Sequence, residues 1–410
     1  MFSDLPKTAI VMRVAILFFL SLAPFASGIA DTDTADPDIL AEDDIVTDER
    51  ADSLGDLPVA DNAAAVLFSG RQFLDPQPLD FLGEEIPAGS YRQLAWSATE
   101  LFEGLPVDTP VLVLHGRNPG PILCLTAAIH GDEINGIEIV RRVLHGLQPS
   151  TLTGTVIGVP IVNIQGFRRG TRYLPDRRDL NRHFPGTTTG SAASRIANSF
   201  FNNVVRHCDA LVDIHTGSFE RSNLPQLRAD LADAGVRALA NGFGATVIVN
   251  SQPRPGTLRY AATLSGVPTV TLEAGGPERL EQEEVTQGVR GIETLLRTLG
   301  MVVSERSTTE REETYYRSAW VRADRGGILI ASVGLGSRVS EGDLLGKITD
   351  PINNETVGIY APRDGRIIGM ARNQVVMPGF AAFHLGLDRI TPDAAAALVA
   401  EPGDNNSSEE

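Results

Sequence analysis

Between residues 62 and 305, short apolar runs alternate with segments whose apolar positions recur every three to four residues. The short runs predict strands, and the longer period predicts helices. The predicted strands are Val111–Leu114, Ile122–Ala127, Thr155–Ile161, Ala210–Ile214, Thr246–Val249 and Thr269–Leu272. The predicted helices are Gly136–Gly146, Ser191–Arg206, Pro225–Gly242, Thr257–Ser265 and Gln282–Leu299. This alternation indicates an α/β domain over 62–305, with a mixed, mostly parallel sheet and flanking helices.

Residues 313–390 have a different pattern, with short apolar runs separated by Gly and Pro. The run Gly327–Ile330 is echoed by Gly365–Ile368, and each is followed by a turn and a second apolar run. Two such halves predict a small C-terminal β-barrel domain, which resembles the biotinyl/lipoyl fold. A carrier of that fold needs a Lys in the hairpin between its halves, and Asp350–Glu355 contains none. We therefore expect the fold without a swinging arm.

The composition of the two ends of the chain predicts segments that lie outside these domains. Lys7 and Arg13 precede a short apolar run, Val14–Pro24, and small residues follow it at Ala26–Ala30. This order predicts a signal peptide over residues 1–30, and hence export, to the periplasm in a Gram-negative source. The alternative is an uncleaved anchor, but the run is short for a membrane span, so we expect no stable membrane insertion.

The formal net charge of −17 comes mostly from two segments. Residues 31–60 contribute −10 and residues 401–410 contribute −4. The composition of 31–61 predicts an acidic disordered linker, and that of 391–410 predicts an acidic tail. The chain contains no basic stripe, so we expect no nucleic-acid partner.

The chain contains two cysteines, Cys124 and Cys208, each in or beside a predicted strand. An exported protein could pair them, but the sequence does not give the distance between them. We expect two separate buried thiols.

The motif His130-Gly131-Asp132-Glu133 and the distant His215 carry the most specific chemistry. Two imidazoles and one carboxylate form the ligand set of a catalytic Zn²⁺ that keeps one coordination position open. Because a predicted strand precedes each histidine, both should lie at the carboxyl edge of the sheet, where open α/β sheets bind ligands. Asp213 precedes His215 by two residues and either orients its imidazole or is a solvated charge at the end of the strand.

Two further segments supply groups that amide hydrolysis needs. Glu273 directly follows the predicted strand Thr269–Leu272, where it could act as the general base for a metal-activated water. The loop from Arg172 to Gly186 is rich in Arg, Asn and Asp. Guanidinium groups there would bind a substrate carboxylate or stabilise an oxyanion.

Four motifs in order, His-Gly-Asp-Glu, Asp-Leu-Asn-Arg-x-Phe, Asp-Ile-His-Thr and Leu-Glu-Ala-Gly, are similar to those of the succinylglutamate desuccinylase/aspartoacylase family, a branch of the zinc carboxypeptidase superfamily. The resemblance spans about residues 84–300 and implies a zinc-carboxypeptidase-like fold. It implies that His130, Glu133 and His215 are the zinc ligands and that Glu273 is the base. It also implies that Asn181 and Arg182 bind the substrate's α-carboxylate and that Arg172 polarises the scissile carbonyl, with Arg168, Arg169, Arg177 and Arg178 as competitors for that last role.

The chain departs from this family at one position. Aspartoacylase has an Arg after a Tyr-Ala-Thr-Thr stretch, and the comparable run Tyr260–Leu264 ends in Leu264. Arg254 or Arg259 could replace that Arg, so selectivity for N-acyl-aspartate or N-acyl-glutamate stays open.

The sequence therefore predicts a zinc-dependent hydrolase that cleaves the N-acyl amide bond of a small carboxylate-bearing molecule, such as an N-acyl amino acid. One alternative is a carboxypeptidase-like peptidase that acts on short or cell-wall peptides. Another is a non-catalytic binding protein in which the barrel carries the function. An oligomer is compatible with each.

Overall fold

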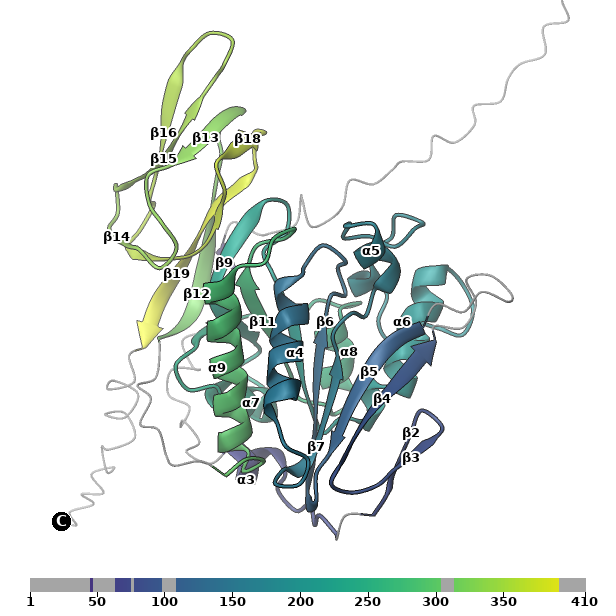
Figure 1. Ribbon diagram of the computed structural model, residues 1–410. Coiled ribbons are helices and arrows are strands. Elements are labelled where there is room, and N and C mark those ends of the chain that lie inside the picture. Colours follow the sequence, from purple (N-terminus) through teal and green to yellow (C-terminus); the bar gives the residue numbers. More distant parts are fainter. Residues whose placement is uncertain (1–44, 47–62, 75–76, 98–107, 304–312, 391–410) are drawn as a thin grey trace, which may run out of the picture. The chain divides into compact units, whose positions relative to one another are not determined.

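The computed structural model describes residues 45–46, 63–74, 77–97, 108–303 and 313–390 (Figure 1). The predicted signal peptide at 1–30 and tail at 391–410 lie outside these residues. The predicted linker at 31–61 also lies outside them, apart from strand β1 (Ile45–Val46). No helix in the described ranges is both long and apolar enough to cross a membrane.

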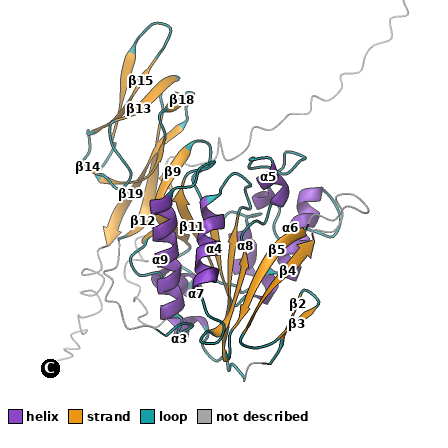
Figure 2. Cartoon of the chain, in the orientation of Figure 1, coloured by secondary structure: helices purple, strands orange, loops and turns teal. Residues whose placement is uncertain are grey.

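The first domain combines strands of one large sheet and of a separate two-stranded sheet, the first two strands in the list below, with helices (Figure 2). Its strands are β2 (Leu79–Phe81), β3 (Glu84–Ile86), β4 (Ser90–Ser97), β5 (Asp108–His115), β6 (Asn118–Ala127), β7 (Thr153–Val159), β8 (Ala210–His215), β9 (Arg221–Ala229), β10 (Val247–Asn250) and β11 (Thr269–Gly275). Its helices are α3 (Ala63–Leu67), α4 (Asn135–Gly146), α5 (Ile164–Arg168), α6 (Ala192–Asn203), α7 (Ala234–Asn241), α8 (Leu258–Leu264) and α9 (Gln282–Thr298), with 3₁₀ turns η1 (Leu180–Arg182) and η2 (Val205–His207).

The sheet is mixed, as predicted, and its centre is parallel. Along it the strands follow the order β4, β5, β7, β6, β8, β11, β9, and the four from β7 to β11 run parallel to one another. Two apolar clusters cover its faces, one with side chains of α4, α7 and α9 and the other with side chains of α6 and α8. Strands β8 and β11 are buried along their whole length, which explains their nearly continuous apolar runs.

The helix predicted at Pro225–Gly242 is wrong in its first part. Residues up to Ala229 form strand β9, and the helix α7 begins only at Ala234, with the Asp233 carboxylate accepting a hydrogen bond from Val236 N at 2.8 Å. Strand β9 pairs with one neighbour before Pro225 and with another from Gln226 onward. Proline has no N–H to donate, so it is tolerated where a strand changes partner. The mixed apolar and polar pattern here was misread as helical.

The C-terminal residues are β-rich, as predicted. Their strands are β12 (Thr314–Arg322), β13 (Gly327–Ala331), β14 (Arg338–Val339), β15 (Leu344–Thr349), β16 (Thr356–Tyr360), β17 (Gly365–Ala371), β18 (Gln374–Val376) and β19 (Ala381–Ile390). Four of them form a separate sheet in the order β16, β15, β13, β18. The likeness to the lipoyl fold stays a prediction.

A closed five-stranded barrel joins the two predicted domains. Its strands follow the order β17, β19, β12, β10 and β9, and antiparallel pairing of β17 with β9 closes the ring. Two of these strands come from residues 221–250 and three from the C-terminal residues. Because β9 also pairs with β11, the barrel and the central sheet share a strand.

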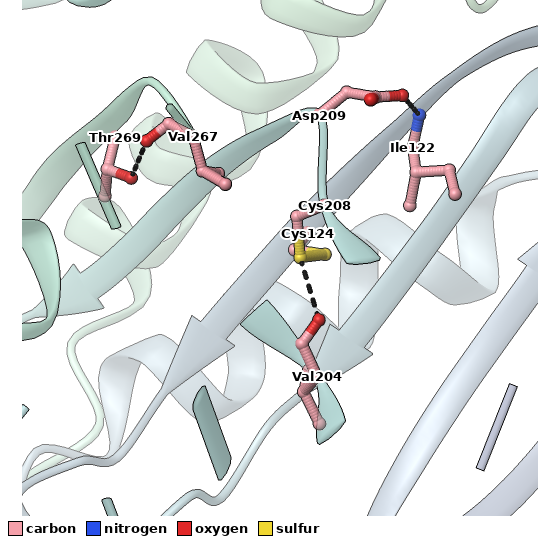
Figure 3. Close-up of a disulfide and its surroundings, with 7 residues drawn as sticks. All are labelled: Ile122, Cys124, Val204, Cys208, Asp209, Val267 and Thr269. Carbon is pink, nitrogen blue, oxygen red and sulfur yellow. Dashed lines mark hydrogen bonds between the residues drawn. A yellow bond between two sulfur atoms is a disulfide. The ribbon is translucent and has the colours of Figure 1, made fainter. Parts of the chain in front are cut away.

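The two cysteines form a disulfide, so the expectation of separate thiols was wrong (Figure 3). Cys124 lies on β6, and Cys208 lies two residues before β8, which pairs in parallel with β6. This pairing places their Cα atoms 5.8 Å apart although 84 positions separate them in sequence. Both are buried, and the bond ties together the two strands that precede the predicted histidine ligands.

Candidate metal centre

Neighbouring parallel strands bring the predicted ligands together. His130 follows β6 by three residues and His215 ends β8, while Ala127 and Ile214 are paired between these strands. Glu133 lies in the loop between β6 and α4. In that loop a Cβ at Gly131 would come within 2.1 Å of the backbone of Gly166 and Phe167, so the close approach of another segment requires glycine there. His130 is 3% exposed, Glu133 1% and His215 5%, so the three predicted ligands are shielded from bulk water.

The three side chains present their donor atoms to one another. The Nδ1 atoms of His130 and His215 are 3.2 Å apart. The Glu133 carboxylate lies 2.7 Å from the first through Oε1 and 2.8 Å from the second through Oε2. Zinc binds imidazole nitrogen and carboxylate oxygen at about 2.0–2.2 Å, so a tetrahedral ion needs donors about 3.3 Å apart. The spacing fits one divalent ion with little rearrangement.

Each imidazole is held from behind by a second carboxylate. Nε2 of His215 lies 2.8 Å from Asp213 Oδ2, and Nε2 of His130 lies 3.1 Å from Asp179 Oδ1. Such partners fix the ring and leave the other nitrogen for a metal. Of the two interpretations of Asp213, the structure therefore supports the orienting one. The sequence reasoning missed Asp179, although it stands in the Asp-Leu-Asn-Arg motif.

The electrostatics of the cluster favour a bound cation. Burial and the Arg172 cation oppose protonation of His130, but the Glu133 and Asp179 carboxylates outweigh them and raise its pKa. Burial also opposes protonation of His215, whereas Asp213 and Glu133 raise its pKa well above the ordinary value. Burial opposes ionisation of Glu133, yet the two imidazoles hold its pKa far below the usual range. A divalent ion would meet this demand for positive charge and displace the imidazole protons.

Arg172 lies beside this cluster. Its guanidinium donates to Asp179 Oδ2 at 2.7 Å and lies 3.5 Å from Glu133 Oε1. The side chain is buried and is positioned 5.6 Å from the centre of the Phe219 ring. The structure thus brings Arg172 to the predicted ligands. Its four competitors, Arg168, Arg169, Arg177 and Arg178, are exposed.

Asn181 and Arg182 form part of the turn η1, two and three residues after Asp179. The Asn181 Oδ1 atom accepts a hydrogen bond from Leu258 N at 2.8 Å, at the start of α8. Arg182 Nη1 donates to the backbone carbonyl of Asn181 at 3.0 Å. Both residues lie near the cluster because they follow Asp179 in the chain. Their side chains are half-buried and so remain partly accessible.

Glu273 lies at the same edge of the sheet as the predicted ligands. It is paired with His215 in the parallel register of β11 and β8. Its Oε1 lies 3.2 Å from Nε of Arg228, and its Oε2 accepts a hydrogen bond from Asn223 Nδ2 at 3.1 Å. The sequence reasoning missed both partners, because Arg228 fell within the wrongly predicted helix and Asn223 fell outside every predicted element. An alternation of polar and apolar residues in Gln226–Ala229 was the signal for a strand.

The two arginines considered as replacements at Leu264 are placed differently. Leu264 is 74% exposed, and Arg254 is exposed. Arg259 is buried and donates to the Ser251 carbonyl oxygen at 2.8 Å and to its Oγ at 3.2 Å. Burial, together with the nearby Arg228 cation, lowers the pKa of Arg259 to about 10, while the Glu273 carboxylate partly offsets this. Of the two, Arg259 is the buried one, and its charge interacts with that of Glu273.

This chain is similar to known proteins in both sequence and fold. Residues 119–299 match the succinylglutamate desuccinylase/aspartoacylase catalytic domain. The N-alpha-acetyl-L-2,4-diaminobutyric acid deacetylase of Halomonas elongata is 30% identical over 290 residues, which are 67% of this chain and 82% of that relative. The succinylglutamate desuccinylase of Pseudomonas aeruginosa is 27% identical over 239 residues, or 52% of this chain and 64% of that relative.

Solved structures of the same kind superpose on the chain. A succinylglutamate desuccinylase/aspartoacylase from Rhodobacter sphaeroides has a TM-score of 0.64 at 26% identity and covers 72% of this chain and 95% of its own. The product-bound ectoine utilization protein EutE (DoeB) from Ruegeria pomeroyi has a TM-score of 0.65 at 25% identity, covering 74% and 98%. The chain belongs to the succinylglutamate desuccinylase/aspartoacylase family, and it is a hydrolase that acts on N-acyl amides.

Proposed function

We propose that this protein is a zinc-dependent deacylase that cleaves the N-acyl amide bond of a small carboxylate-bearing substrate such as an N-acyl amino acid. One observation supports this most strongly. Two imidazoles and a carboxylate present donor atoms to one another within 3.2 Å, and Glu273 is paired with one of them across the sheet. A binding protein has no need for a carboxylate placed beside a ligand cluster.

His130, Glu133 and His215 would hold the metal through two nitrogens and one carboxylate, a donor set that zinc hydrolases use. Bound there, Zn²⁺ would supply Lewis acidity that lowers the pKa of a water molecule and polarises the scissile carbonyl. Asp213 and Asp179 keep each imidazole turned with Nδ1 toward the cluster. The metal site therefore depends on five side chains from three segments of the chain.

The remaining residues perform the proton and charge steps. Glu273 takes a proton from the attacking water and delivers it to the leaving nitrogen, which leaves as a free amine. Arg172 places its cation beside the cluster, where it stabilises negative charge that develops on the carbonyl oxygen. Asn181 and Arg182 bind the substrate's carboxylate, with Arg182 as the charged partner.

The relatives support the class of substrate. One removes an acetyl group from a diaminobutyric acid, and another removes a succinyl group from glutamate, by their names. Both substrates are N-acylated amino acids. The bond that is broken and the free carboxylate are common to them, whereas the acyl group and the side chain differ.

We further propose that the protein is exported, with residues 1–30 as its signal peptide. The Cys124–Cys208 disulfide supports this, because disulfides persist in oxidising compartments. We also propose that the C-terminal strands keep a lipoyl-like fold without a carrier function. Asp350–Glu355 contains no Lys, which supports this assignment.

The proposal is tested with purified protein that has been stripped of metal and reloaded with zinc. The probes are N-α-acetyl-L-2,4-diaminobutyrate, N-succinyl-L-glutamate, N-acetyl-L-glutamate and a set of short peptides with free carboxyl termini. We expect zinc-dependent release of a free amine from at least one N-acyl amino acid and little cleavage of the peptides. Turnover of the peptides alone would instead favour the carboxypeptidase-like alternative.

A further inference from the structure

The two oxygens of Glu273 are held by two residues of one strand. Arg228 Nε lies 3.2 Å from Oε1, and Asn223 Nδ2 donates to Oε2 at 3.1 Å. Both partners lie on β9, and the side chain of Glu273 is only 11% exposed. A Glu side chain has three rotatable bonds, and these two contacts leave it little freedom to change its direction.

Strand β9 is also the strand through which the closed barrel meets the central sheet. Asn223 is paired with Gly369 of β17, and Gly369 is in turn paired with His384 of β19. His384 is paired with Trp320 of β12 and stacks on its ring, with the ring centroids 4.4 Å apart. A row of paired residues therefore runs from the C-terminal strands to the contact partner of Glu273.

Gly369 lies where this row leaves no room for a side chain. A Cβ there would come within 2.6 Å of Asn223 Oδ1 and 3.3 Å of the Cβ of His384. The first distance is below any normal contact, and Oδ1 is the end of a side chain that can rotate. The Asn223 amide would therefore turn, and its Nδ2 would leave the carboxylate of Glu273.

From these contacts we propose that Asn223 is a positioning residue for the base Glu273, and that Gly369 of the C-terminal strands maintains this position by leaving room for the Asn223 amide. The proposal rests on the assignment of Glu273 as the base. In this proposal, the C-terminal strands of the barrel help to orient the catalytic base. Each carboxylate oxygen has two acceptor sites, so the contacts of Glu273 still leave room for a proton.

A purely structural role predicts a different result. If Asn223 and Gly369 only stabilise the barrel, their substitutions lower the thermal midpoint and leave the turnover of the folded fraction unchanged. If they orient Glu273, kcat falls while KM and zinc content persist, because the metal ligands and the carboxylate-binding residues are untouched. Small errors in the placement of a reacting group are costly for rate.

The experiment is a double-mutant cycle in the full chain with Asn223→Ala, Gly369→Ala and the double variant. The readouts are kcat and KM on whichever of N-α-acetyl-L-2,4-diaminobutyrate and N-succinyl-L-glutamate is turned over, zinc per chain, and the thermal midpoint. We expect each single variant to lose about ten- to a hundredfold in kcat. Once Asn223 is Ala, Gly369→Ala should cost nothing further in kcat, because the displaced amide is gone.

The matched control is Asn373→Ala, which removes an Asn between β17 and β18 that accepts a hydrogen bond from Ala331 N at 3.0 Å. It should keep the normal kcat. If Gly369→Ala does not fold, Asn223→Asp is measured in its place. This substitution keeps the size of the side chain but places a second carboxylate against Glu273. The kcat of Asn223→Asp should therefore fall at least as far as that of Asn223→Ala.

Two results would overturn the inference. One is an equal loss from Gly369→Ala in both backgrounds of the cycle. The other is a normal kcat for Asn223→Ala and Asn223→Asp. Glu273→Gln is measured beside them: if it stays active, the assignment of the base has failed, and if it is inactive while the Asn223 variants are normal, only the positioning inference has failed.

Discussion

Glu273 and His215 are paired residues of two neighbouring parallel strands, β11 and β8. Paired residues in a sheet point to the same face, so the proposed base and a proposed zinc ligand share one edge and one direction. Fifty-seven positions lie between them in sequence, and only the parallel register brings them together.

Glu273→Gln should lower kcat by about 10²–10⁴-fold, because an amide cannot take the proton from water. Zinc content should not change, since Glu273 is not one of the three predicted ligands. Steady-state kinetics and metal analysis of the same sample test this. Glu293→Gln, an exposed change on α9, is the control and should behave as the wild type. An active Glu273→Gln protein would falsify the assignment of the base.

Asp213→Asn should weaken zinc binding by about 10–100-fold, because the amide is a poorer partner for Nε2 of His215. Competition with a zinc chelator at fixed pH measures this change. Thr126→Val is a useful companion, since Thr126 donates to Asp213 Oδ1 at 2.8 Å and does not touch the imidazole. We expect a smaller loss from it. Equal zinc affinity in wild type and Asp213→Asn would contradict the orienting role.

Loss of the disulfide should destabilise the protein without removing the site. The Cys124–Cys208 bond closes a loop of 84 residues, and removal of such a bond costs about 2–5 kcal/mol of unfolding free energy. Urea unfolding of the Cys124→Ser/Cys208→Ser double variant measures the loss. Wild type unfolded under a reducing agent should lose a similar amount. If reduction changes neither midpoint nor slope, the two cysteines are not bonded in the folded protein.

His384 should make stability fall at acid pH. Burial first, and then the nearby Arg228 and Arg221 cations, lower its pKa well below the ordinary 6.5. In the folded state the imidazole therefore stays neutral, while the unfolded chain binds a proton as pH drops below that value. The unfolding free energy should fall below pH 6.5 by up to about 1.4 kcal/mol per pH unit from this group alone.

The substitution His384→Phe tests this sign, because it keeps a ring against Trp320 and removes the titrating group. Urea unfolding between pH 7.5 and 5 should show a shallower loss of stability in the variant than in wild type. His145→Phe, on the exposed side of α4, serves as the control and should keep the wild-type slope. Parallel slopes for wild type and His384→Phe would show that His384 does not contribute.

Local sequence patterns predicted most of the fold and the proposed metal ligands. Continuous apolar runs identified β6, β8 and β11, because strands buried on both faces must be apolar throughout. His130, Glu133 and His215 follow or end such strands, and Glu273 lies near the carboxyl end of β11, so their convergence could be expected from the rule that sites lie at carboxyl edges.

What could not be predicted depends on pairing between distant segments. The closure of the barrel by β17 on β9, the disulfide and the contact of Asp179 with His130 each join residues far apart in the chain. No local period encodes such partners. The strand β9 was missed because it contains Pro225, and because apolar and polar residues continue without a clear break from it into the helix α7.

The central claim is that His130, Glu133 and His215 bind one zinc ion. A crystal structure of the zinc-loaded protein, with anomalous data collected on both sides of the zinc absorption edge, measures this directly. We expect one strong peak about 2.0–2.2 Å from Nδ1 of each histidine and from a Glu133 oxygen. A zinc-loaded crystal with no peak among these three side chains, or with the peak bound elsewhere, would contradict it.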